Sequence, residues 1–509
     1  MKTVGGKIVI VGGGIAGLCA GVLAQKCGYH AEVLEMHDIA GGLATSWRRG
    51  GYTFETCLHW LYGSNPQGTM YPQWRDVMDI DRLTFVPLHQ LVTIQTERGD
   101  RLPIPTNVDR LEKELTARFP HDTKAIRHFA ADIRRLSQFR MPVPGGNARQ
   151  NLAALWHDLP LFPLFHRLAN ISCRDYGKSF SDPLLRTFFG DGELDNLAAL
   201  AQFFSIAWMN SGDAAYVVGG SLAIIRLIEE KLRGLGGNIR FCAKVDRILV
   251  ENGRATGVEL VSGEKIMADW VISAADGHAT LNHLLGGKYS NSKLDKQYAR
   301  PNLFPSYLQV SLGVAMDLSA QPALLTRILD APLYLDPTTQ LNQVSFRFFH
   351  FDPTFAPAGK TAVTCFLPTR NYQYWTGLRE NDPARYRAEK ARVAADVTAI
   401  LEPIVVGIRD AIEVVDVSTP ATVIRYTGNW QGSMEGWLLS PGQKFRSLPN
   451  TLPGLRNFVM AGQWIFPGGG LPSGPMSARS ALLAICKADR VAFDPGPKSE
   501  SLTPAPLAL

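Results

Sequence analysis

The feature that most constrains this chain is a glycine-rich turn between a short strand and a helix near the N-terminus. Residues 7–11, KIVIV, form a mostly apolar, β-branched run of the kind found in central parallel strands buried on both faces. The run is followed by Gly12-Gly13-Gly14-Ile15-Ala16-Gly17, which fits the pattern GxGxxG. Residues 15–27 have the pattern of a helix and residues 31–34 that of a second strand. The segment therefore predicts a βαβ unit.

Each glycine of this motif answers a separate physical need. The first permits the tight turn from strand to helix, the second lets the backbone approach a pyrophosphate, and the third allows the helix to pack closely on the strand. The helix N-terminus then presents unpaired N–H groups to the anion. A carboxylate at the end of the next strand, 18 residues past the motif, can accept the ribose hydroxyls. The predicted dinucleotide site comprises Gly12, Gly14, Ile15, Ala16, Gly17 and Glu35.

Further segments make the chain resemble a known flavoprotein group. Gly41-Gly42-Leu43 follows the ribose acid by a few residues, and GGYTFETCLHWLYG occupies residues 50–63. Near the other end are STPATVIRYTGNWQGSMEGW, residues 418–437, and NFVMAGQWIFPGGGLPSGPMSARSA, residues 457–481. Together these segments resemble the group that includes amine oxidases, protoporphyrinogen oxidase, phytoene desaturases, carotenoid cis–trans isomerases and retinol saturase.

The resemblance implies that the dinucleotide is FAD and that both ends of the chain hold it. In this group the GG pair, here Gly41 and Gly42 with Leu43 after it, passes beside the FAD phosphates and ribityl chain. A valine in the middle strands, matched by Val245, bonds the adenine through its backbone. The C-terminal segment places a strand end, Gly462, and a helix N-terminus, Met476, against the flavin pyrimidine and ribityl chain.

Two departures favour the polyene branch of the group over the amine oxidases. Amine oxidases usually carry Arg after the GG pair, where this chain has Leu43. Many also carry a Lys on a central strand that faces the flavin, and the strand we align, residues 307–314, has none. We therefore expect an FAD-dependent oxidoreductase that acts on a long apolar polyene, carotenoid or retinoid-like. The sequence does not choose between desaturation, saturation and cis–trans isomerisation.

Two alternative functions remain beside a polyene oxidoreductase. A flavin amine oxidase acting on a small amine would carry the Arg and the Lys that are absent. A non-catalytic relative that binds prenyl groups or other lipids would have lost the phosphate-binding glycines, and these are intact.

The candidate catalytic residue is His59, which lies in the segment expected to pass the flavin. Its imidazole could relay a proton near neutral pH, or it could pack and hydrogen-bond beside the ring without transferring protons. Cys57, Arg425 and Glu435 are further residues that could contact substrate or flavin. No His or Cys cluster has metal-ligand spacing, so no metal site is predicted.

The predicted fold class is α/β, with a doubly wound, Rossmann-like FAD-binding domain and an inserted α+β substrate domain. Residues 1–70, 205–290 and 455–492 are assigned to the FAD-binding domain. Residues 71–204 and 291–454 are assigned to the substrate domain. The Pro- and Ser-rich residues 493–509 are expected to form a disordered tail.

Charge and cysteine content bear on the surroundings of the protein. The net charge of the chain is +6. Residues 98–186 alone account for it, with 15 Lys and Arg against 9 Asp and Glu. This excess suits an anionic membrane surface or an ordinary solvated face, and is too weak for nucleic acid. The seven cysteines include no CxxC pair, which favours a reducing compartment. We expect a cytoplasmic protein, and the sequence leaves open whether it also binds peripherally to a membrane. The apolar residues 159–165 either dip into that membrane or form a lid over a substrate tunnel.

Overall fold

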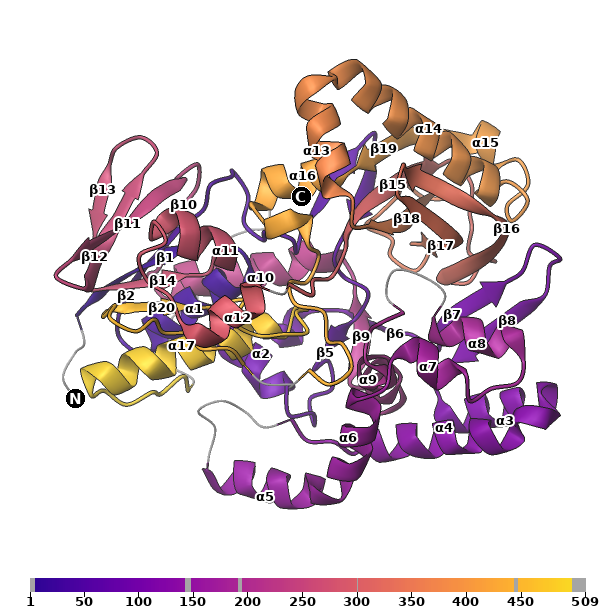
Figure 1. The fold of residues 1–509 in the computed structure, drawn as a ribbon, viewed down its shortest axis with the longest axis horizontal. Coiled ribbons are helices and arrows are strands. Elements are labelled where there is room, and N and C mark those ends of the chain that lie inside the picture. Colours follow the sequence, from indigo (N-terminus) through magenta and orange to yellow (C-terminus); the bar gives the residue numbers. More distant parts are fainter. Residues whose placement is uncertain (1–4, 142–147, 191–194, 300, 444–446, 497–509) are drawn as a thin grey trace.

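A parallel sheet carries the glycine-rich turn (Figure 1). The structure is a computed structural model that describes residues 5–141, 148–190, 195–299, 301–443 and 447–496. Within these ranges the sheet has the strand order β10-β2-β1-β14-β20, and every neighbouring pair is parallel. Its strands are β1 (Lys7–Val11), β2 (His30–Leu34), β10 (Asn238–Arg240), β14 (Trp270–Ser273) and β20 (Phe458–Met460).

The central strand β1 is buried because its side chains alternate between two cores. Ile8 and Ile10 pack with the helices of one face, α1 (Ile15–Lys26), α10 (Gly220–Gly234) and α17 (Ser473–Asp489). Val9 and Val11 pack with the opposite face. That face is covered by an antiparallel sheet of β11 (Val245–Glu251), β12 (Arg254–Leu260) and β13 (Lys265–Met267). It is also covered by the π-helical turn Thr280–Leu284, which follows α11 (Gly277–Ala279), and by α12 (Ser292–Ala299).

A second, larger sheet forms the other part of the molecule (Figure 1). Its strand order is β19-β15-β18-β17-β16-β7-β8, in which only the pair of β7 and β16 is parallel. One face packs on α13 (Tyr372–Asn381) and α14 (Pro383–Leu401). Its strands are β7 (Gln90–Gln95), β8 (Arg101–Pro105), β15 (Ser306–Val314), β16 (Leu324–Asp336), β17 (Thr339–Phe348), β18 (Thr361–Thr369) and β19 (Ile412–Ser418).

Helices between residues 108 and 210 pack around a separate core of Phe, Leu and Ile side chains. Asn107 caps the first of them by accepting a hydrogen bond from the N–H of Arg110, as its position before the helix predicts. The helices of this core are α3 (Val108–Arg118), α4 (Thr123–Leu136), α6 (Phe162–Ala169), α7 (Cys173–Gly177), α8 (Pro183–Phe189) and α9 (Ala199–Asn210). The helix α5 (Ala148–Asp158) lies in the same stretch, but none of its described side chains belongs to this core.

Short elements complete the chain. A hairpin of β3 (Ser46–Arg49) and β4 (Tyr52–Glu55) follows the GG pair, and β5 (Leu61–Tyr62), β9 (Ala214–Val217) and β6 (Phe85–Pro87) pair in a small sheet. The remaining helices are α2 (Tyr71–Val77), α15 (Ile408–Ala411) and α16 (Pro420–Thr427).

The predicted fold class is confirmed, with local differences. The parallel sheet draws its strands from the three stretches assigned to the FAD-binding domain, while the boundaries themselves stay a prediction. One local feature is the helix α2, which begins the segment 71–106 ahead of the strands β6, β7 and β8. Of the predicted tail, residues 497–509 lie outside the described residues.

Candidate functional site

The turn between β1 and α1 is shaped by backbone contacts that only glycine permits. Gly12 has a φ of +99°, in the region that other residues avoid. A Cβ on Gly17 would lie 1.9 Å from the carbonyl oxygen of Gly12, so a glycine is needed for the helix to start this close to the strand. A Cβ on Gly14 would meet only the carbonyl oxygen of Gly41, at 3.8 Å. The space in front of Gly14 is therefore open to a ligand.

Glu35 is held at the end of β2 by two backbone N–H groups, one from the glycine-rich turn and one from the loop that follows β2. Its carboxylate accepts hydrogen bonds from the N–H groups of Gly13, at 2.8 Å, and His37, at 2.9 Å. The side chain is buried, yet it borders the cavity described below. Its place beside the glycine turn is the one that the ribose-binding role requires.

The GG pair docks directly on the first glycine motif. The N–H of Gly41 donates to the carbonyl oxygen of Gly13 at 2.9 Å, and Gly41 forms an isolated bridge with Gly14. Gly41 and Gly42 have φ angles of +127° and +62°. Both positions therefore favour glycine, and the pair extends the same backbone cradle.

The C-terminal segment closes this cradle from the other end of the chain. The N–H of Gly462 donates to Oγ of Ser477 at 2.9 Å. A Cβ on Gly474, in the first turn of α17, would lie 2.9 Å from Cγ2 of Ile15, so the N-termini of α17 and α1 pack against each other. The helix begins at Ser473, three residues before the predicted Met476, whose side chain is buried within the first turns.

One cavity of about 1230 Å³ connects these parts with the larger sheet. It exceeds the usual range of small-molecule sites, about 300–1,000 Å³, and so has room for a dinucleotide and a second ligand. All the predicted cofactor residues except Gly17 line it. These are Gly12, Gly14, Ile15, Ala16, Glu35, Gly41, Gly42, Leu43, Val245, Gly462 and Met476.

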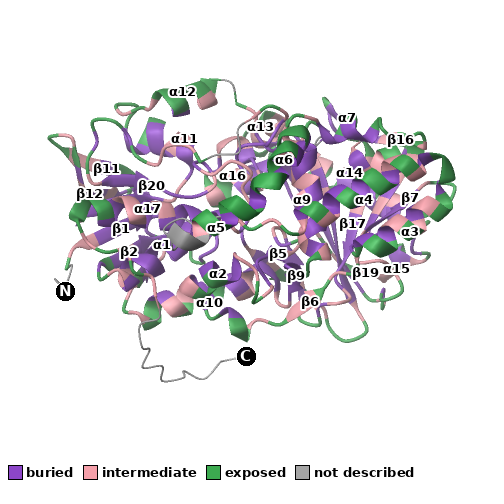
Figure 2. Cartoon of the chain, turned by 90° about the horizontal axis from the view of Figure 1, so that it is seen from below, coloured by how far each residue is buried: buried purple, intermediate pink, exposed green. Residues whose placement is uncertain are grey.

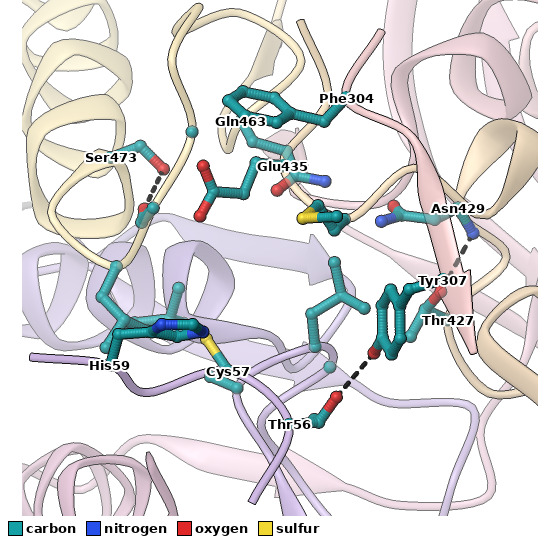
Figure 3. A pocket seen from close by; sticks show the side chains of 18 of the residues that line it. Thr56, Cys57, His59, Phe304, Tyr307, Thr427, Asn429, Glu435, Gln463 and Ser473 are labelled. Carbon is teal, nitrogen blue, oxygen red and sulfur yellow. Dashed lines mark hydrogen bonds between the residues drawn. The ribbon is translucent and has the colours of Figure 1, made fainter. Parts of the chain in front are cut away.

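The cavity residues fit a dinucleotide at one end and an apolar ligand at the other. The open space at Gly14, the first-turn N–H groups of α1 and the carboxylate of Glu35 suit a pyrophosphate and a ribose. The far end is lined largely by aromatic side chains: Phe188, Phe204, Trp208, Tyr307, Phe349 and Phe366. The hydroxyls of Tyr307 and Thr56 lie 2.6 Å apart (Figure 3).

The segment between β4 and β5 is fixed by the buried carboxylate of Glu55. This carboxylate accepts hydrogen bonds from the N–H groups of Cys57, Leu58 and Ser221, and from the Ser221 hydroxyl. Ser221 lies in the first turn of α10, so Glu55 ties residues 55–58 to a helix N-terminus. The segment that lines the cavity is therefore rigidly placed.

His59 borders the cavity next to a buried arginine that the sequence analysis missed. Nη2 of Arg347, on β17, lies 2.9 Å from Nδ1 of His59. His59 lies inside the protein with its side chain open to the cavity. Desolvation there, and then the charge of Arg347, lower the pKa of His59 to about 3. The imidazole is thus neutral at pH 7, which suits a hydrogen-bond donor better than a proton relay.

The other candidate residues differ in how they face the cavity. Figure 3 shows Cys57, His59 and Glu435 around the same space. Burial raises the pKa of Glu435 to about 7, and burial followed by the charges of Glu55 and Glu435 raises the pKa of Cys57, so this thiol stays protonated. Arg425 is exposed at the cavity edge, over the ring of Tyr426.

Arg347 was missed because a strand pattern does not say what a residue faces across the fold. The alternation in SFRFF, residues 345–349, is the only local signal: Phe346 and Phe348 enter the core behind the sheet, so Arg347 must face the other side. That this side is the cavity follows only from the tertiary structure.

Comparisons with known proteins support the Rossmann-like fold and the family resemblance. A family model described as an NAD(P)-binding Rossmann-like domain matches residues 10–79. The chloroplastic prolycopene isomerase of Arabidopsis thaliana is 24% identical, over 97% of this chain and 84% of the relative. A neurosporene-forming phytoene desaturase of Rhodobacter capsulatus is 25% identical, over 82% of each chain. The predicted resemblance to the carotenoid desaturases and isomerases is confirmed.

A solved structure shows the same fold. An oxidoreductase from Methanosarcina mazei superposes with a TM-score of 0.59 at 17% identity, and the match covers 94% of this chain and all of that one.

Proposed function

We propose that this protein is an FAD-dependent oxidoreductase that desaturates, saturates or isomerises a long apolar polyene. The observation that carries the proposal is the single cavity, which runs from the glycine cradle to aromatic walls on the larger sheet. The relatives named prolycopene isomerase and phytoene desaturase match 97% and 82% of this chain and support the same class of substrate.

We propose the following role for each residue of the cofactor site. Gly12, Gly14 and the first turn of α1 would hold the pyrophosphate, Glu35 the ribose, and Val245 the adenine. The remaining groups would meet the ribityl chain and the flavin ring: Gly41, Gly42, Leu43, Gly462 and Met476.

The chemistry needs little from protein side chains. A bound flavin accepts a hydride from a C–H bond or returns one to a C=C bond. The aromatic walls align the polyene and exclude water. Glu435 is the group in this part of the cavity that can hold or release a proton near neutral pH, because burial raises its pKa to about 7.

We further propose that α5 and α6 touch a membrane, from which the polyene enters. Exposed residues lie along α5 and α6 (Figure 2). In this segment Leu155, Trp156, Leu159 and Phe162 are 46–68% exposed. On the inner side Phe165 packs on Phe204, which lines the cavity, with ring centroids 5.8 Å apart. The segment thus has an apolar outer face that can enter a membrane and an inner face that packs beside the cavity wall.

Within the described ranges, none of the helices combines the length and the apolar character that crossing a bilayer needs.

The test is product analysis with holoprotein and polyenes supplied in liposomes. Chromatography and mass spectrometry should show a polyene whose number or geometry of double bonds has changed, and Glu35→Ala should lower the amount of this product in step with its flavin occupancy. If every polyene is recovered unchanged while a small amine is oxidised, the amine oxidase alternative replaces this proposal.

A further inference from the structure

A buried guanidinium faces the cavity without an anionic partner. Arg347 is 7% exposed, and its guanidinium contacts Nδ1 of His59 at 2.9 Å and the carbonyl oxygen of His59 at 3.4 Å. Among the residues that the structure describes, no carboxylate comes within 4.0 Å of it. A guanidinium has five N–H donors, so several remain for a ligand.

Burying an unpaired charge costs free energy, and no group among the described residues fully offsets this cost for Arg347. Burial lowers the pKa of Arg347 only to about 10, so the group stays charged near neutral pH. Removing an ion from water costs several kcal/mol unless a partner repays it. Glu55 acts on Arg347 from a distance, but its carboxylate is taken up by backbone N–H groups and the Ser221 hydroxyl. A hydrocarbon substrate would leave this cost unrelieved.

His59 supplies a second donor at the same place. A guanidinium can only donate, so Nδ1 of His59 accepts and the ring proton is on Nε2. The side chain of His59 is exposed to the cavity. Arg347 and His59 together therefore present a charged and a neutral donor, which is the arrangement that binds a carboxylate.

We propose that Arg347 and His59 bind a carboxylate at one end of the substrate, so that the natural substrate is a polyene acid and not a pure hydrocarbon. This inference rests on the proposed polyene function and names the class of polyene. The same cavity wall carries further polar groups beside Arg347, namely Gln343, Ser345 and Thr364. These groups can form hydrogen bonds with a polar end of the substrate, directly or through water, which aromatic walls alone cannot do.

The test uses cis-parinaric acid, a fluorescent polyene acid, and its uncharged methyl ester, each titrated into the holoprotein. Charge-assisted hydrogen bonds predict that the acid binds about 10- to 100-fold more tightly than the ester. Arg347→Met should bring this ratio near one and leave the affinity for the ester unchanged, whereas Arg347→Lys should keep part of the preference. The matched control is Arg327→Met, an arginine on the neighbouring strand β16 that is 8% exposed and donates to carbonyl groups of residues 96 and 97.

The outcomes separate this inference from the function on which it rests. Equal binding of acid and ester by the unchanged protein overturns the inference, as does a preference that survives Arg347→Met, while the polyene function stands in both cases. Loss of flavin absorbance in Arg347→Met also overturns it, because the arginine would then serve the cofactor. If neither probe binds, the proposed polyene function fails as well.

Discussion

At the scale of single residues, Glu35 joins the predicted ribose site to the glycine turn. Its two backbone hydrogen bonds fix the carboxylate where the cavity begins. Glu35→Ala removes both the ribose acceptor and the partners of two N–H groups, so we expect FAD affinity to fall by about 10- to 100-fold. Flavin occupancy, measured from absorbance after dialysis, checks this.

The matched control for this change is Glu32→Ala. Glu32 lies on the same strand and forms an ion pair with Lys7 at 2.8 Å, away from the cavity lining. This variant should keep its flavin. Equal occupancy in Glu35→Ala and the unchanged protein would refute the role of Glu35.

A second residue, Asp276, makes stability depend on pH. Burial raises the pKa of this carboxyl to about 6, although it accepts the N–H groups of Ala279 and Trp430. The folded state keeps the proton that the unfolded state has already lost, so the contribution to stability is present at low pH and is lost as pH rises through 6. Between pH 5 and pH 7 the loss is about 1 kcal/mol.

Asp276→Asn should remove this loss, because the amide keeps an acceptor but does not ionise. Urea midpoints at pH 5 and pH 7 measure it. Asp182→Asn is the control, since Asp182 also caps a helix but is less buried. If both variants and the unchanged protein respond equally to pH, Asp276 does not titrate as described.

Residue roles could be predicted from the sequence where they depend on neighbours along the chain. Gly12, Gly14 and Gly17 act within one turn, and their pattern identified them. Arg347 meets His59 across 288 residues, and no local pattern encodes such a meeting. Glu435 was named as a candidate from its segment, but its altered acidity depends on burial that only the fold provides.

At the scale of elements, the apolar outer face of α5 and α6 has a measurable consequence. If this face enters the membrane, Trp156→Glu with Phe162→Glu should reduce the fraction of protein that floats with anionic liposomes by several-fold, since charged side chains resist entry into the acyl region. Density-gradient flotation measures that fraction.

The control for flotation is Val406→Glu. Val406 is 83% exposed between α14 and α15, outside the proposed contact. It should leave flotation unchanged. Equal flotation of the double variant and the unchanged protein would favour the alternative in which the segment only covers the tunnel.

Elements were predicted well where hydrophobic period and caps agree, and poorly where tertiary contacts decide. The strands β1 and β2 and the helix α1 follow their patterns closely. The start of α17 at Ser473 was placed three residues late, because glycines and prolines mask a helix start that packing against Ile15 stabilises. The prolines near residues 160–163 end α5 and occupy the first turn of α6, where proline is tolerated.

At the scale of the whole molecule, the cofactor site depends on a meeting of the two chain ends. In the parallel sheet β20 pairs with β14, which in turn pairs with β1. This arrangement brings Gly462 close to α1: a Cβ on Gly462 would lie 3.7 Å from the Cβ of Ala16. The resemblance to a flavoprotein group supplied this architecture before the structure did. It did not predict the polar side chains of the larger sheet that line the cavity, Arg347 among them, and these side chains favour a polyene acid as substrate.

The most direct test of the central claim is an anaerobic spectrum. The bound flavin is reduced in the holoprotein, a polyene is added in detergent micelles without oxygen, and the visible spectrum is followed; the oxidised form is treated in parallel. We predict that at least one polyene restores the oxidised flavin band, is itself isomerised, or bleaches the oxidised flavin. If every polyene leaves both spectra as the sum of their separate components, this protein does not carry out flavin chemistry on polyenes.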